Sequence, residues 1–230
     1  MQFIINGKTY NVKTDSQGIA YLDANLAVGK YDVTIINPVT GATANATTTI
    51  VKRLIDNKDI TMDFLDGTYY VVRAIDDDGT PVGAGEVVKI STHDRDYAMV
   101  TDSNGYARLK INLNPDTYTV TAQFRAYKVS NKLKVKQTLF LVKKTVTVKK
   151  SAKKLVIKAK LKWSNGKPIK GKTLKLKFKG KTYKAKTSKK GIAKFTIKKK
   201  VIKKLKKGKK YTYSVSYNTN TVKGKVKVKK

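Results

Sequence analysis

Most of the chain alternates apolar and polar residues with a period of two. The segments Leu174-Lys-Leu-Lys-Phe178 and Val222-Lys-Gly-Lys-Val-Lys-Val228 show this pattern most clearly. A period of two places successive side chains on opposite faces of a strand, so that one face is buried and the other is wet. Turn-forming residues separate the short segments at intervals of about ten residues, as is typical of β-sandwiches. We therefore predict an all-β protein made of tandem antiparallel β-sandwich domains.

One unit of sequence occurs three times. Each copy contains a segment that begins with Tyr, passes through Thr and Gly, and ends at Ala; these segments are residues 10–20, 97–107 and 183–193. The glycines Gly18, Gly105 and Gly191 lie 87 and 86 residues apart. Because glycine readily adopts the positive φ of a tight turn, we expect a β-hairpin at each segment.

Further turns and strands define the boundaries of the copies. The second and third copies begin with turns at residues 78–85 and 165–171, and the first copy has no equivalent. We therefore expect the chain to be a piece of a longer protein whose first copy lacks its opening strands. The predicted units are a truncated sandwich at 1–53, a complete sandwich at 54–137 and a lysine-rich terminal sandwich at 138–230.

The third copy has seven extra residues between its repeated glycine and the Tyr strand that follows. In this insertion Val201, Ile202 and Leu205 are spaced as on one turn of a helix. We predict a helical turn that packs on the edge of the sandwich and is closed by Gly208.

Charge divides the chain into two unequal parts. Residues 143–230 carry 35 Lys, no Arg and no acid, so they hold +35 of the formal net charge of +36. A bias toward Lys over Arg does not explain why Asp and Glu are absent after Asp116. Because like charges repel one another and weaken a compact fold, such an excess indicates attraction to an anionic partner.

The repeated motifs resemble the immunoglobulin-like repeats of large prokaryotic surface adhesins. The shared pattern is D-[DG]-G-x-P-V-x-G, then T-D-x-x-G-x-A, then G-x-Y-x-V. The lysine-rich last copy, with G-K-T-Y-K-A-K-T-x-K-K-G and K-G-K-K-Y-T-Y, resembles the C-terminal domain of adhesin-like proteins of methanogenic archaea. The resemblance implies tandem immunoglobulin-like domains, an extracellular location on the cell surface or in the cell wall, and attachment.

The sequence offers little to catalysis. There is no Cys, and His93, the one His, lies in the polar stretch Ser91–Asp96. No phosphate-binding glycine loop and no His/Cys metal spacing is present. No apolar run is long enough to cross a bilayer. We predict a non-enzymatic protein with no cofactor.

Acidic residues give two weaker candidates. Asp76, Asp77 and Asp78 are candidate calcium ligands, although Asp is also favoured in turns for local hydrogen bonding. The adhesin resemblance implies that an isopeptide cross-link assisted by a buried acid occurs in some sandwiches of this kind. Glu86 is the one Glu and therefore the candidate helper in the second copy; the alternative is that it begins a strand and points to water.

Lysines on the wet faces of several strands predict a broad basic surface rather than a pocket. The candidate ligand-binding residues are Lys175, Lys177, Lys179, Lys181, Lys184, Lys186, Lys223, Lys225 and Lys227. Trp163 is a candidate sugar contact, with packing at the sandwich edge as the alternative.

We expect the last domain to bind an anionic cell-wall polymer and to anchor the protein, with the nearly neutral copies as spacer. One alternative is an adhesive head that grips anionic glycans on another cell. Another is non-specific nucleic-acid binding; sequence-specific reading is not expected, because bidentate readout favours Arg. An anionic lipid surface ranks lower, since no insertion helix accompanies the lysines.

Overall fold

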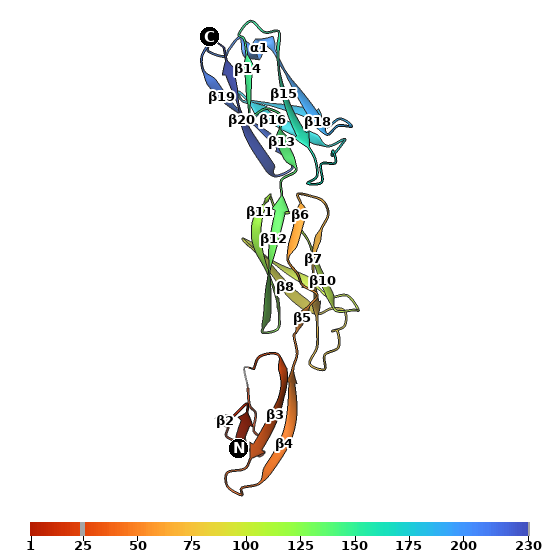
Figure 1. Ribbon diagram of the computed structural model, residues 1–230, viewed down its shortest axis with the longest axis vertical. Coiled ribbons are helices and arrows are strands. Elements are labelled where there is room, and N and C mark those ends of the chain that lie inside the picture. Colours follow the sequence, from red (N-terminus) through yellow and green to blue (C-terminus); the bar gives the residue numbers. More distant parts are fainter. Residues whose placement is uncertain (24–25, 230) are drawn as a thin grey trace.

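The computed structural model describes residues 1–23 and 26–229. Figure 1 shows three β units placed end to end, with the two termini at opposite ends of the molecule. We call them the first unit (residues 2–50), the middle sandwich (54–136) and the lysine-rich sandwich (139–228).

The first unit is a single antiparallel sheet with strand order β2-β1-β3-β4. Its strands are β1 (Gln2–Ile5), β2 (Lys8–Asn11), β3 (Gly29–Ile36) and β4 (Thr43–Ile50). Among the described residues of this unit, only Ile5 and Val33 are buried apolar residues. Within the described part of this unit, one face of the sheet is therefore not covered by a second sheet.

The middle sandwich packs a three-stranded sheet on a five-stranded one. The smaller sheet has the order β10-β7-β5 and the larger β6-β12-β11-β8-β9. The strands are β5 (Leu54–Ile55), β6 (Ile60–Asp63), β7 (Tyr69–Ala74), β8 (Val87–Thr92), β9 (Arg95–Val100), β10 (Tyr106–Lys110), β11 (Asp116–Phe124) and β12 (Tyr127–Lys136).

The lysine-rich sandwich repeats this arrangement, with the orders β13-β15-β18 and β14-β20-β19-β16-β17. Its elements are β13 (Leu139–Leu141), β14 (Thr145–Val148), β15 (Lys154–Leu161), β16 (Thr173–Phe178), β17 (Lys181–Lys186), β18 (Ile192–Lys198), α1 (Lys199–Ile202), β19 (Lys210–Tyr217) and β20 (Asn220–Val228).

Both sandwiches divide their first strand between the two sheets. The second half of that strand, β6 or β14, pairs in parallel with the last strand, β12 or β20. All other pairings are antiparallel, and each sandwich has its own hydrophobic core. The predicted fold class, tandem immunoglobulin-like sandwiches, is confirmed.

The predicted hairpins at the repeated glycines are wrong. β9 belongs to the five-stranded sheet and β10 to the three-stranded sheet, so the segment between them crosses the core from one sheet to the other. The turn itself is tight, since the Gly105 N–H donates to the Asp102 carbonyl at 2.9 Å. β17 and β18 repeat the crossing around Gly191. The alternating pattern shows which side chains face inward, but both sheets supply inward faces, so the pattern does not identify the partner strand.

The predicted helical turn in the insertion is present as α1, and Ile202 and Leu205 are fully buried. Gly208 does not close it, contrary to the prediction. The helix ends at Ile202, and the chain continues in tight turns through Leu205. Gly208 instead donates its N–H to the Val228 carbonyl at 3.0 Å, and so leads into β19.

Candidate binding surface

The outer face of the five-stranded sheet in the lysine-rich sandwich carries most of the candidate lysines. On β16, Lys175 and Lys177 alternate with the buried Leu174, Leu176 and Phe178. The three apolar side chains fill the core, and the same pleat turns the two lysines to solvent.

Strand pairing gathers lysines from three strands on this one face. Side chains of directly paired residues point to the same side of a sheet. Lys175 pairs with Lys184 of β17 and with Ser216 of β19, and Ser214 pairs with Lys177 on one side and Lys223 on the other. The basic face is defined here as Lys175, Lys177, Lys184, Lys186, Lys223, Lys225 and Lys227.

Two of the candidate lysines lie outside the basic face. Lys181 pairs with the buried Phe178 and therefore points to the inner side of the sheet edge. Lys179 lies in the turn between β16 and β17, where its Nζ sits 5.0 Å from the centre of the Tyr211 ring. This cation–π contact holds Lys179 against the rim of the core.

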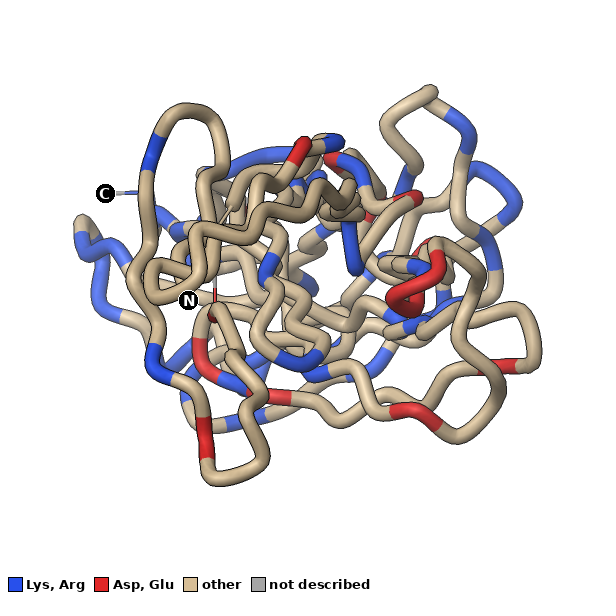
Figure 2. Tube along the Cα trace, turned by 90° about the horizontal axis from the view of Figure 1, so that it is seen from below, with Lys and Arg blue, Asp and Glu red and all other residues tan. Residues whose placement is uncertain are grey.

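Among the residues that the structure describes, no acid pairs with a lysine of the basic face. Every ion pair among the described residues joins groups between Arg53 and Arg125. The equivalent face of the middle sandwich differs, because Lys89 there pairs with Asp96 at 2.7 Å. Figure 2, which looks along the molecule, shows basic segments on all sides. Because every charged side chain in residues 143–230 is a lysine, the lysine-rich sandwich is positive throughout.

The calcium candidates are engaged by arginine. Asp76 accepts from Arg125 at 3.0 Å and from Arg53 at 3.5 Å, and Asp77 pairs with the same two arginines. Asp78 accepts from the Thr80 hydroxyl at 2.7 Å, and this bond lowers the pKa of the Asp78 carboxyl. The described part of the chain contains no group of three or more acidic, His or Cys side chains suited to a metal.

Glu86 points to water at the start of a strand, and Trp163 packs at the edge of its sandwich, as the alternatives to a helper acid and a sugar contact predict. Glu86 is exposed just before β8, and its backbone N–H, rather than its carboxylate, bonds to the Thr101 hydroxyl at 3.0 Å. Trp163 is half-buried and packs against the core of the lysine-rich sandwich at the turn before Pro168. His93 is exposed in the turn between β8 and β9.

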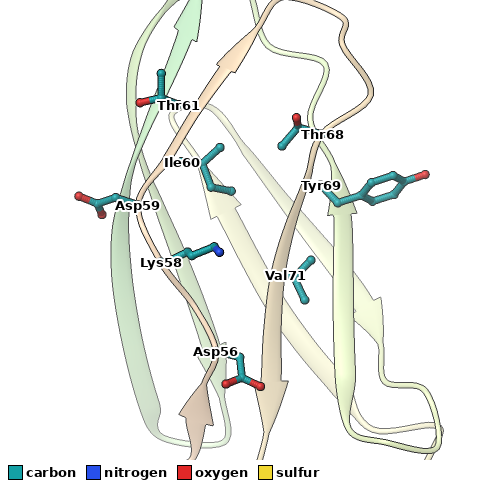
Figure 3. A pocket seen from close by; sticks show the side chains of 8 residues that line it. All are labelled: Asp56, Lys58, Asp59, Ile60, Thr61, Thr68, Tyr69 and Val71. Atoms are coloured by element: carbon teal, nitrogen blue, oxygen red, sulfur yellow. The ribbon is translucent and has the colours of Figure 1, made fainter.

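A small hollow, which the sequence did not indicate, lies where the first strand of the middle sandwich changes sheets. It has a volume of about 260 Å³ and is lined by residues of the β6 and β7 region, including Asp56, Lys58, Asp59 and Tyr69 (Figure 3). Asp56 accepts from the Tyr106 hydroxyl at 2.9 Å, which raises the pKa of Tyr106. Asp59 accepts from the Lys132 N–H at 2.8 Å. Both carboxylates therefore fasten strands together.

No helix in the described residues is long and apolar enough to cross a membrane. No protein-family model matches the chain. No curated protein matches it either.

Several solved structures are similar to this chain at low identity. The I9–I11 tandem of titin matches with 11% identity and a TM-score of 0.43, over 99% of this chain and 87% of that one. A Ca2+-stabilised adhesin with which an Antarctic bacterium binds ice matches with 15% identity and a TM-score of 0.28, over 99% of this chain and 64% of that one. Invasin, a bacterial integrin-binding protein, matches with 18% identity and a TM-score of 0.33, over 75% of this chain and 38% of that one. These values are too low to carry a ligand or a role over to this chain.

Proposed function

We propose that this chain is part of a non-enzymatic, extracellular repeat protein of the cell surface, in which the lysine-rich sandwich binds an anionic polymer of the cell envelope. The nearly neutral first unit and middle sandwich serve as spacer. The observation that carries the proposal is the basic face: its lysines have no acidic partner among the described residues, and the sequence of their domain contains no acid.

Charge density favours a polymer over a small ligand. Each exposed lysine contributes little alone, but neighbouring lysines lie within about one Debye length (about 8 Å at physiological salt) and act together. A polymer with many anionic groups can engage many of them at once. The face offers no enclosed pocket to a compact ligand, since none of the hollows found among the described residues is lined by the basic face.

The resemblance to methanogen adhesin-like repeats supports a location at an archaeal cell surface. An adhesive head that grips anionic glycans on another cell uses the same basic face and is the second candidate function. The two differ in their target and not in their chemistry.

Retention on isolated cell walls tests the proposal. The whole chain and a variant that ends at residue 137 would be mixed with purified walls of the source organism across a salt series. We expect the whole chain to be retained at low salt and released as salt rises, and the shorter variant to wash through. Retention on foreign cells but not on the organism's own wall would favour the adhesive head. Free passage of the whole chain at low salt over both would overturn the proposal.

A further inference from the structure

A strip of hydroxyl groups runs through the middle of the basic face. Three of the four outward residues of β19 are Thr212, Ser214 and Ser216; the fourth, Lys210, lies at the start of the strand and pairs with Lys227. We call these three residues the hydroxyl strip. Their side chains are short, whereas the lysines on the neighbouring strands are long, so the strip forms a low floor between two raised rows.

The two rows belong to β16 and β20. Lys175 and Lys177 pair with Ser216 and Ser214 on one side, and Lys223 and Lys225 pair with Ser214 and Thr212 on the other. Strand geometry sets the spacing: lysines follow one another at about 7 Å within a row, and the rows lie about 10 Å apart. A thin, extended chain lying along β19 would thus meet one lysine row from the β16 side and one from the β20 side, and the two rows face each other directly at Ser214.

Lysine density alone does not produce this arrangement. The opposite sheet of the same sandwich also exposes lysines, and Lys158 pairs there directly with Lys194. Its neighbouring outward pair is Val156 with Thr196, and Lys160 pairs with Phe140. That face therefore has charge without a continuous hydroxyl floor.

The middle sandwich has the floor but lacks one row. Thr117, Thr119 and Thr121 occupy three of the outward positions of β11, with Gln123 at the fourth, and Lys134 and Lys132 pair with the first two from β12. On the β8 side Thr121 pairs with Ser91, and the nearby Lys89 is bound to Asp96. Within the described residues, the strip with free lysines on both sides occurs in the lysine-rich sandwich alone.

The chemistry of the strip favours phosphate on a hydroxylated backbone. Lysine binds phosphate as a point charge, and Ser and Thr hydroxyls can donate to phosphate oxygens or accept from sugar hydroxyls. No aromatic residue lies among the outward residues of β16, β19 and β20, so nucleobases would find no stacking partner.

We propose that the hydroxyl strip and its two lysine rows bind a linear phosphodiester polymer of sugars or polyols, which lies along β19. This deepens the proposed function and rests on it. The polymer would be read by the regular spacing of its charges as well as by their number.

The test compares variants of equal charge. In the full chain, K177Q/K223Q removes the two lysines that flank Ser214, and K158Q/K194Q removes a directly paired set from the opposite sheet. Affinity for purified poly(glycerol phosphate) would be measured across a salt series, with Trp163 fluorescence in urea confirming that each variant is folded. The slope of log K against log salt is negative, and we expect K177Q/K223Q to reduce its magnitude by about 1 per lysine. K158Q/K194Q should leave the slope nearly unchanged.

A variant that keeps every lysine separates the floor from the charge. T212V/S214V/S216V replaces the three hydroxyl residues by valine, which also favours strands. We expect it to weaken binding at least about tenfold, since hydrogen bonds to charged groups are lost. If K177Q/K223Q and K158Q/K194Q lost equal affinity, or if the valine variant bound as tightly as wild type, the hydroxyl strip would not be the binding site. The proposed function would still stand in either case.

Competing polymers test the ligand class. If polyglutamate or oligo(dT) bound more tightly than poly(glycerol phosphate), the assignment of the ligand as a phosphodiester polymer of sugars or polyols would be overturned. Absence of binding to any polyanion at about 50 mM salt would overturn the proposed function itself.

Discussion

Gly105 and Gly191 occupy equivalent turns, and both have positive φ angles, +77° and +72°. A Cβ on Gly105 would lie 2.7 Å from the Ala74 carbonyl oxygen, and one on Gly191 would overlap the Leu161 carbonyl oxygen. A Cβ on Gly18, at the same place in the first unit, would have no other atom within 4 Å among the described residues. The described residues of the first unit form one sheet, so no second sheet brings a backbone close to Gly18 there.

Substitution of Gly191 should therefore be costly in the lysine-rich sandwich. We expect Gly191→Ala to lower the free energy of unfolding by about 3 kcal/mol or more, from the clash together with the left-handed conformation. Gly180→Ala is the matched control, because Gly180 has a φ of +73° and open space around it. It should cost about 1 kcal/mol. Urea unfolding followed by Trp163 fluorescence measures both; equal costs would contradict the role assigned to the Leu161 carbonyl.

Tyr70 is fully buried in the middle sandwich, and burial raises the pKa of its phenol to about 12. Its hydroxyl donates to the Asn131 side chain at 2.8 Å. Because the unfolded phenol ionises near pH 10, its contribution to stability is complete below pH 10 and is lost as pH rises toward about 12.

We therefore expect Tyr70→Phe to make the middle sandwich less sensitive to alkali. Asn131 keeps a partner in this variant, since its oxygen also accepts from Asn57 at 2.9 Å. The measurement is urea unfolding by circular dichroism at pH 8, 10 and 11. A loss of stability with pH that is the same in wild type and variant would show that the Tyr70 phenol does not carry the effect.

Among the elements, the two junctions between units differ: side-chain contacts join the two sandwiches, whereas hydrogen bonds and ion pairs between the first unit and the middle sandwich are absent from the described residues. Asp63 at the end of β6 accepts from both the N–H and the hydroxyl of Ser164, each at 3.0 Å. Phe64 meets Tyr217 edge to face, with ring centres 6.2 Å apart. In the described part of the chain, no hydrogen bond or ion pair joins residues 1–52 to residues 54–229.

This contrast predicts a stiff pair of sandwiches with a hinge before it. Asp63→Ala should loosen the pair by removing two charge-assisted hydrogen bonds. Asp94→Ala, in the exposed turn between β8 and β9, serves as control and should change nothing. Residual dipolar couplings measured on the full chain report the orientation of the two sandwiches. One fixed orientation that survives Asp63→Ala would show that these bonds are dispensable.

At the scale of the whole molecule, 35 lysines without an acid should make salt a stabiliser of one part only. Screening weakens the repulsion among these lysines as the Debye length falls from about 30 Å at 10 mM to about 8 Å at 150 mM. Residues 1–142 carry 16 basic and 15 acidic groups and lack such a surplus.

We therefore expect the unfolding midpoint in urea, followed by Trp163 fluorescence, to rise with NaCl between 10 and about 300 mM. Trp163 is the one tryptophan and lies in the lysine-rich sandwich, so it reports that domain. Calorimetry of the full chain should show the transition of the middle sandwich moving much less. If the urea midpoint of the lysine-rich sandwich did not change with NaCl, repulsion among its lysines would not weaken its folded state.

The alternating strands, the repeat and the uneven distribution of charge can all be read from the sequence. Alternation fixed which residues of β16 and β20 are buried, because a strand turns successive side chains to opposite faces. The spacing of Ile202 and Leu205 likewise predicted the helical turn that buries them.

How these elements combine into sheets is visible only in the folded chain. A local pattern records which face of a strand is buried, but not which strand lies beside it, because pairing joins residues far apart in the sequence. For that reason the predicted hairpin at Gly105 is a crossing between sheets. The same limit hid the hydroxyl strip: Ser214 acquires a lysine on either side only because β16 and β20, distant in the sequence, both pair with β19.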